Sequence, residues 1–233
     1  METRTERGPL ASPDTTRSRA GLDRDERIVK DGILRMGSLV EAQIRTSLRA
    51  ITARDAGLAA ETIAADEGVN QAQHQINEAV TMTIATQQPV ARDLRFLLAL
   101  NHVAYELERI GDHATSLAKQ ARRMAGEPPL PGAAELERMG SLAADLVRGI
   151  LEALVDVDDV RARSVAARDD EIDHLYRDVF SRVVAAMRAD PDAVEQGTRV
   201  ILAAHWIERI GDRVTNIAED VVYLASGSIE DLN

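Results

Sequence analysis

One five-residue segment, Glu-Arg-Ile-Gly-Asp, occurs twice in the chain, at Glu108–Asp112 and again at Glu208–Asp212. Each copy lies inside a long stretch whose apolar residues recur three and four positions apart, which indicates a helix. Outside these segments, Arg35–Leu39 repeats at Arg138–Leu142, 103 positions further on, and Asp66 has its counterpart in Asp169 at the same spacing. The chain is therefore predicted to be an internal duplication of one helical unit.

Turn signals divide the 233 residues into two copies of three helices. A proline ends the second helix of each copy, because proline cannot extend a helix and disfavours the helical conformation before it. The Pro/Gly-rich segment Gly126–Gly132 is the expected linker. We predict an all-α protein of two tandem antiparallel three-helix bundles. Its expected parts are a disordered arm (1–21), a first repeat (22–126) and a second repeat (133–227). The expected helices are 22–54, 55–87, a third ending near 125, 133–157, 158–189 and a sixth ending near 226.

Composition excludes several classes of protein. The absence of cysteine excludes disulfides, iron–sulfur clusters and thiol nucleophiles. We expect no membrane-spanning helix, because no run of about 18 apolar residues is present. The net charge of −11 argues against nucleic-acid binding, which needs a basic face. The N-terminal arm, rich in Arg, Thr, Ser and Pro, lacks the apolar stretch of a signal peptide.

The repeated carboxylates are expected to point away from the core. In the third helix an apolar stripe with alternating spacings of four and three forms the buried seam. Relative to Leu107 on that seam, Glu108 lies at about 100° and Asp112 at about 140° around the helix axis. Two carboxylates at positions i and i+4 lie about 6 Å apart and repel each other, and Gly111 is an unfavourable residue inside a helix. Each copy therefore combines two locally unfavourable choices.

Two interpretations of these residues remain open. A bound cation would offset the repulsion, and the glycine would let a ligand or another backbone approach. Alternatively, Arg109 and Arg209 neutralise the carboxylates, and the glycine only permits a tight helix crossing.

Further acidic pairs extend the predicted metal sites onto a second helix of each repeat. Asp66 and Asn70 are four positions apart, as are their counterparts Asp169 and Asp173. Asn216 could add a carbonyl ligand to the second site. Because the second set contains four carboxylates and the first has three and an amide, we expect the second site to bind a cation more strongly. The candidate metal ligands are Asp66, Asn70, Glu108 and Asp112 in the first repeat, and Asp169, Asp173, Glu208 and Asp212 in the second.

The sequence resembles the PhoU family, the phosphate-signalling accessory proteins of bacteria, from about residue 23 to 227. The resemblance rests on RMGSLVE, on the acidic pairs, on QQPVARDLR before the third helix, and on ERIGDHA and ERIGDRVTNIAED. It implies a pseudo-twofold, all-helical protein of two three-helix bundles whose E/D-x-x-x-D motifs hold iron or other metals on the surface. On this basis Glu108, Asp112, Glu208 and Asp212 are the primary ligand candidates.

The resemblance also implies a cytoplasmic, often dimeric negative regulator of the phosphate response. The implied partners are the ATPase of the phosphate ABC transporter and a sensor histidine kinase, with the membrane reached only through them. The cofactor is expected to be a divalent or trivalent metal, iron first, with Mg, Mn or Zn as alternatives.

Two other classes of protein share features with this sequence. Carboxylate-bridged metalloenzymes use two E-x-x-H motifs that face the core, whereas only Glu171-x-x-His174 fits, and it lacks a counterpart. We therefore expect no catalysis. A metal-free helical adaptor, whose acidic faces meet a basic partner directly, differs from the main interpretation only in the ion.

Overall fold

The computed structural model describes residues 15–128 and 132–232. Within these ranges both repeats are built from helices alone. This confirms the predicted all-α class. The first repeat contains α1 (Thr15–Ala53), α2 (Ala56–Ala64), α3 (Asp66–Gln87) and α4 (Ala91–Met124). The second contains α5 (Ala133–Asp156), α6 (Asp159–Ala166), α7 (Asp169–Ala189), the short 3-10 helix η1 (Pro191–Ala193) and α8 (Val194–Ser226). None of the helices in these ranges is long and apolar enough to cross a membrane.

The helices differ from the sequence prediction in three places. α1 begins at Thr15, so residues 15–21 are helical and not part of a disordered arm; residues 1–14 lie outside the described ranges. The second and fifth expected helices are each divided, at Ala65 and at Ala167–Arg168. Because the backbone around each break stays in the right-handed helical region, the apolar periodicity continues through it and conceals it.

The new helices α3 and α7 begin at the acidic residues Asp66 and Asp169. Carboxylates in a first turn stabilise a helix start by interacting with the positive end of its dipole. The expected starts of the second and fifth helices, at residues 55 and 158, are confirmed. There the side chains of Asp55 and Asp158 cap α2 and α6, accepting hydrogen bonds of 2.9 Å from the backbone nitrogens of Leu58 and Arg161.

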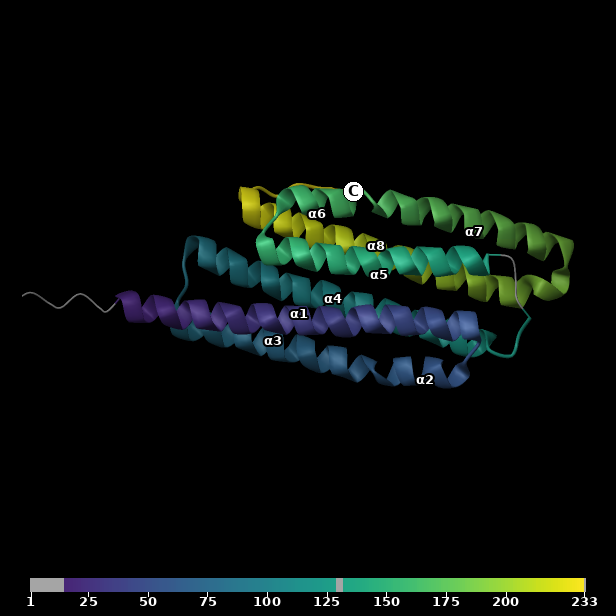
Figure 1. Ribbon diagram of the computed structural model, residues 1–233, viewed down its shortest axis with the longest axis horizontal. Helices are drawn as coiled ribbons and strands as arrows, with labels where there is room; N and C mark the ends of the chain where they lie inside the picture. Colours follow the sequence, from purple (N-terminus) through teal and green to yellow (C-terminus); the bar gives the residue numbers. More distant parts are fainter. Residues whose placement is uncertain (1–14, 129–131, 233) are drawn as a thin grey trace, which may run out of the picture.

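The molecule is elongated, with α1, α4, α5 and α8 packed together along its length (Figure 1). α2 and α3 flank this central set along one long edge, and α6 and α7 flank it along the opposite edge (Figure 1). The core stripe predicted for the third helix is confirmed, since its residues in α4 are buried apart from the partly buried Phe96. The corresponding stripe of α8 is buried apart from Leu224.

Reciprocal contacts between α1 and α5 join the repeats. Leu151 of α5 lies where a Cβ on Gly37 would be, and Leu48 of α1 lies where a Cβ on Gly140 would be. Gly37 and Gly140 occupy equivalent positions, as do Leu48 and Leu151. The two contacts are thus related by a pseudo-twofold axis, and they give a packing reason for the repeated Arg-Met-Gly-Ser-Leu segments.

Candidate functional site

The two Glu-Arg-Ile-Gly-Asp segments lie at the antiparallel interface of α4 and α8. Glu106, two residues before the first segment, is buried and accepts a hydrogen bond of 3.2 Å from Asn216 Nδ2. Its carboxylate also lies 3.4 Å from Arg213 Nη1. Further along, His102 Nδ1 lies 2.7 Å from Asp220 Oδ2. This polar network fixes α4 against α8, so the two acidic motifs lie close to the pseudo-twofold axis.

The second acidic cluster combines Asp169 and Asp173 from α7 with Glu208 and Asp212 from α8. Burial raises the pKa of Asp169 to about 7, helped by the neighbouring charges of Asp212, Asp173 and Glu208. The pKa of Glu208 is also raised, by burial first and then by Asp212 and Asp173. These mutual effects show that the four predicted carboxylates of this repeat share one electrostatic site.

Gly211 makes room for one of these carboxylates. A Cβ at this position would collide with Asp169 Oδ1, so only glycine lets α7 bring the carboxylate onto α8. Asp169 Oδ1 is buried and accepts no hydrogen bond within the described residues. Glu208 Oε2 is likewise buried without a hydrogen-bond donor there, although His205 Nδ1 lies 3.3 Å away. Buried oxygens without partners are costly, and a cation or a proton would relieve that cost.

The first acidic cluster is built differently. Burial raises the pKa of Glu108, with added repulsion from Asp112 and Asp66, and burial followed by Asp66 raises the pKa of Asp112. Asp66 accepts a hydrogen bond of 2.9 Å from Thr115 Oγ1. A Cβ at Gly111 would meet Val69 Cγ1 at 3.1 Å and no carboxylate. In this repeat the glycine therefore serves helix packing, which is the alternative weighed from the sequence.

Not every predicted ligand joins its cluster. Asn70 lies one turn after Asp66 on α3 and, within the described ranges, makes no hydrogen bond to the cluster carboxylates. The side chain of Asn216 donates a hydrogen bond to Glu106 through Nδ2, and the addition of its carbonyl oxygen to the second site stays a prediction. Asp212 Oδ2 is paired with Arg209 Nη1 at 2.8 Å, as in the interpretation in which the arginines of the motif neutralise its carboxylates.

Neither cluster is a ready-formed metal site. Among the residues that the structure describes, no three His, Asp or Glu side chains are arranged so as to hold one metal ion. The donor chemistry of the second cluster still fits a hard cation, because it offers oxygen ligands only, two of them buried without hydrogen-bond donors. Binding there would require Asp212 to exchange Arg209 for the ion.

An aromatic group beside the second cluster was missed from the sequence. The ring of His113 stacks on that of Trp206, with 5.5 Å between the ring centroids. The ring of His205 lies 5.4 Å from that of Trp206 and 6.4 Å from that of Tyr176. Burial lowers the pKa of His113 to about 4, with further lowering by Arg209 and Arg213. The sequence did contain a sign of this group, because Trp206 and its counterpart Glu106 differ between the repeats. That difference points to a contact only once α4 and α8 are known to pack together.

The duplicated bundles and paired surface clusters of carboxylates define a class of two-repeat, all-helical proteins in which α4 and α8 carry the acidic motifs. The sequence pattern of the PhoU domain matches residues 33–121 and 136–221, covering both repeats. The chain belongs to the PhoU family, as its motifs indicated.

Curated relatives agree with this assignment. The chain is 36% identical over 202 residues to a protein of Clostridium acetobutylicum named as a phosphate-specific transport system accessory protein PhoU homolog, covering 86% of this chain and 92% of the relative. It is 35% identical to the protein of the same name from Pseudomonas aeruginosa, covering 86% of this chain and 83% of the relative. Because such relatives are named as accessory proteins, they also confirm that the chain is not an enzyme.

Solved structures give the same result. The PhoU crystal structure from Pseudomonas aeruginosa superposes with a TM-score of 0.85 at 34% identity, covering 88% of this chain and 99% of the other. The phosphate transport system regulatory protein PhoU from Streptococcus pneumoniae superposes with a TM-score of 0.85 at 27% identity, covering 90% of this chain and 99% of the other.

Proposed function

We propose that this protein is a negative regulator of phosphate uptake and of the phosphate-starvation response. It acts in the cytoplasm as a helical adaptor between the ATPase subunit of a phosphate ABC transporter and a phosphate-sensing histidine kinase. The names of its relatives, which place them with a phosphate-specific transport system, support this role. An adaptor needs no turnover, because a difference in affinity for two states of its partners is enough to transmit a signal.

We further propose that the acidic clusters bind metal and that the metal-loaded surface contacts the partners. The observation that carries this proposal is the Asp169 carboxylate, which is held over Gly211 beside three other carboxylates without a hydrogen-bond donor for Oδ1. Asp169, Asp173, Glu208 and Asp212 would hold the ion in the second repeat, and Asp66, Glu108 and Asp112, with Asn70, in the first. The ion would supply positive charge that offsets the carboxylate repulsion. All-oxygen ligands favour ferric iron, Mg or Mn over Zn.

Metal content tests the assignment. We expect elemental analysis of the purified protein to find iron or another hard metal, and E208A/D212A to lose the share held by the second repeat. The matched variant E108A/D112A should lose less, because the first cluster has fewer carboxylates. An unchanged metal content in E208A/D212A, with its helical signal intact, would exclude the second cluster as a metal site.

The metal-free adaptor is a second candidate: Arg209 pairs with Asp212 at 2.8 Å, so part of the carboxylate charge is offset without an ion, and the remaining carboxylates would meet a basic partner. Chelation separates the two. If a chelator changes neither the melting temperature nor binding to the transporter ATPase, the metal has no role in the mechanism and the acidic faces contact the partner directly. We also propose that the chain forms a homodimer, and sedimentation at several protein concentrations would test this.

A further inference from the structure

Two grooves lie beside the crossing of α1 and α5, and they are related by the pseudo-twofold axis. The first is lined by α1, α2 and α5 and has a volume of about 830 Å³. The second is lined by α1, α5 and α6 and has a volume of only about 300 Å³. Most lining positions of the two grooves correspond at the spacing of 103 residues. Each residue that lines one groove can therefore be compared with its equivalent in the other groove of the same chain.

An ion pair occupies the second groove and is missing from the first. Arg161 Nη1 of α6 lies 3.3 Å from Glu152 Oε2 of α5, so the pair closes that groove across two helices. The equivalent residues in the first groove are Arg49 and Leu58. A leucine cannot pair with the guanidinium, and the first groove stays open and large.

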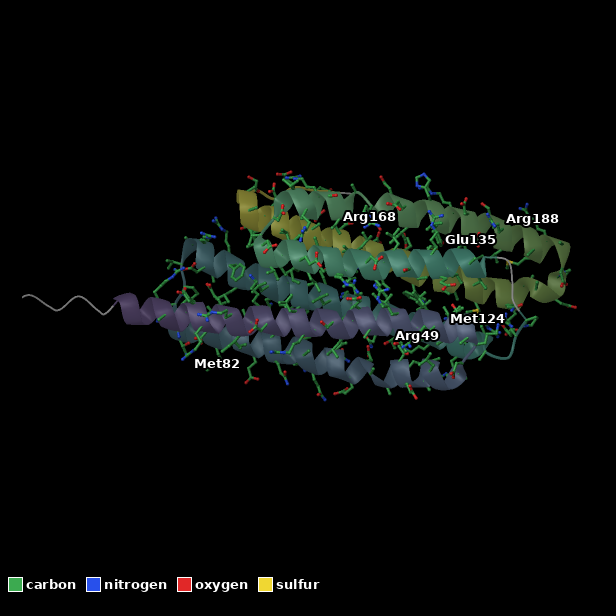
Figure 2. All side chains as sticks on the ribbon, in the orientation of Figure 1. Arg49, Met82, Met124, Glu135, Arg168 and Arg188 are labelled. Atoms are coloured by element: carbon green, nitrogen blue, oxygen red, sulfur yellow. The ribbon has the colours of Figure 1, made fainter. Side chains whose placement is uncertain are left out.

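Arg49 is the cation of this groove that has no carboxylate partner within the described residues. Its side chain, labelled in Figure 2 near the C-terminal end of α1, is exposed and donates a hydrogen bond of 3.2 Å to Thr46 Oγ1. Within the described residues it has no carboxylate partner. The other lining arginine, Arg45, is already paired with Glu41 at 2.9 Å and with Asp145 at 2.8 Å. Among the described residues the first groove thus offers one unpaired cation, Arg49 on α1, and on its α5 side the carboxylate of Glu137, in a protein whose net charge is −11.

The remaining lining suits an amphipathic helix. Leu48 and Leu58, with Ala42 and Ala53, give the groove an apolar floor. From Ala42 to Ala53 the groove follows α1 for about 17 Å, the length of about three helical turns. A helix that fits such a groove places its apolar residues on the floor and its polar residues at the rim.

We propose that the first groove is the docking site for an amphipathic helix of a partner protein, which places apolar side chains on Leu48 and Leu58 and a carboxylate on Arg49. The partner's carboxylate would pair with Arg49, as Glu152 pairs with Arg161 inside the second groove. The groove lies on α1 and α5, whereas the acidic motifs lie on α4 and α8. Docking would therefore leave both acidic clusters accessible, and the inference stands whether or not they bind metal.

The test uses a fluorescent, helix-stabilised peptide of about 14 residues, or about four turns, with a leucine stripe flanked by glutamates. Anisotropy titrations with the full-length chain compare it with the same peptide carrying lysines in place of the glutamates. We expect the acidic peptide to bind and the basic one to bind at least about tenfold more weakly.

Variants exchange the two grooves. R49E/L58R installs the ion pair of the second groove in the first, so it should remain folded while its affinity for the acidic peptide falls about tenfold. The reciprocal variant E152R/R161L opens the second groove and should raise the stoichiometry from one peptide to two. Circular dichroism and thermal melting check the fold of both.

Several results would overturn the proposal: no binding of the acidic peptide by the parent chain, equal binding of both peptides, or unchanged affinity in R49E/L58R. Sedimentation provides one more. If the parent chain self-associates and R49E/L58R does not, the occupant of the groove is a second copy of this chain and not a partner helix.

Discussion

Replacing Asp169 by asparagine should stabilise the metal-free protein at neutral pH. Asparagine keeps the shape of the side chain over Gly211 but removes the charge. The pKa of Asp169 is raised from the ordinary 3.8 to about 7, first by burial and then by three carboxylates. The folded chain therefore holds this proton to a higher pH than the unfolded chain does. The stabilisation is complete below about pH 4 and is lost as the pH rises to about 7.

The size of the effect follows from that pKa difference. At about 1.36 kcal/mol for each unit of pKa, the raised pKa of Asp169 corresponds to about 4 kcal/mol of stability for a fully buried group. Asp169 is only half-buried, and solvent screening reduces the effect to about 2 kcal/mol. D169N cannot titrate, so at pH 8 its free energy of unfolding should exceed that of the parent by about this amount. Near pH 4 the two proteins should be about equally stable.

Urea denaturation followed by circular dichroism, from pH 4.5 to 8 with a chelator present, measures this difference. D170N is the matched control, because Asp170 is the exposed neighbour of Asp169 and its replacement should change stability by less than about 0.5 kcal/mol. If the D169N and parent stabilities stay parallel across this range, the buried, mutually repelling carboxylate cluster does not exist in solution. With metal added, the parent should be more stable than D169N at pH 8, because the parent gains metal-binding energy that D169N lacks.

Two other perturbations test the contacts around the pseudo-twofold axis. G140A should cost about 1–3 kcal/mol of stability, because its Cβ would collide with Leu48 and push α1 from α5. An unchanged midpoint of urea unfolding would contradict this packing. His113 should stay neutral at pH 6, because its pKa is lowered to about 4 by burial and nearby arginines. NMR titration of the ring should show that R209Q raises this pKa, and a titration of the parent near pH 6.5 would refute the buried stack.

The sequence predicted those features that depend on one helix at a time. The apolar stripe of α4, the helix starts near Asp55 and Asp158, and the off-core direction of Glu108 follow from local spacing. The breaks before α3 and α7 could not be predicted, because neither proline nor glycine marks them and the periodicity continues.

The contents of the site were harder to predict where they depend on two helices. The repeated glycines look alike in sequence, yet Gly211 receives a carboxylate and Gly111 receives a valine. The packing itself is alike, because Ile172, the equivalent of Val69, also lies 3.3 Å from the position of a Cβ on Gly211. The difference arises in the side-chain partners: Asp66 accepts a hydrogen bond from Thr115, whereas Thr215 donates to the backbone oxygen of Gly211. In the same way, the partners of Glu106 are 107 and 110 residues away, so no local pattern could reveal them.

The leucine–glycine exchange between α1 and α5 has the form of an isologous subunit interface, in which each partner offers the same patch to the other. A single repeat made alone would expose that patch and should pair with a second copy of itself. In the present chain the two partners are covalently joined, so their association does not depend on concentration. The fusion also lets each half change independently. Trp206 can differ from Glu106, and Arg49 from Glu152, without a matching change on the other side, which no symmetric dimer could achieve.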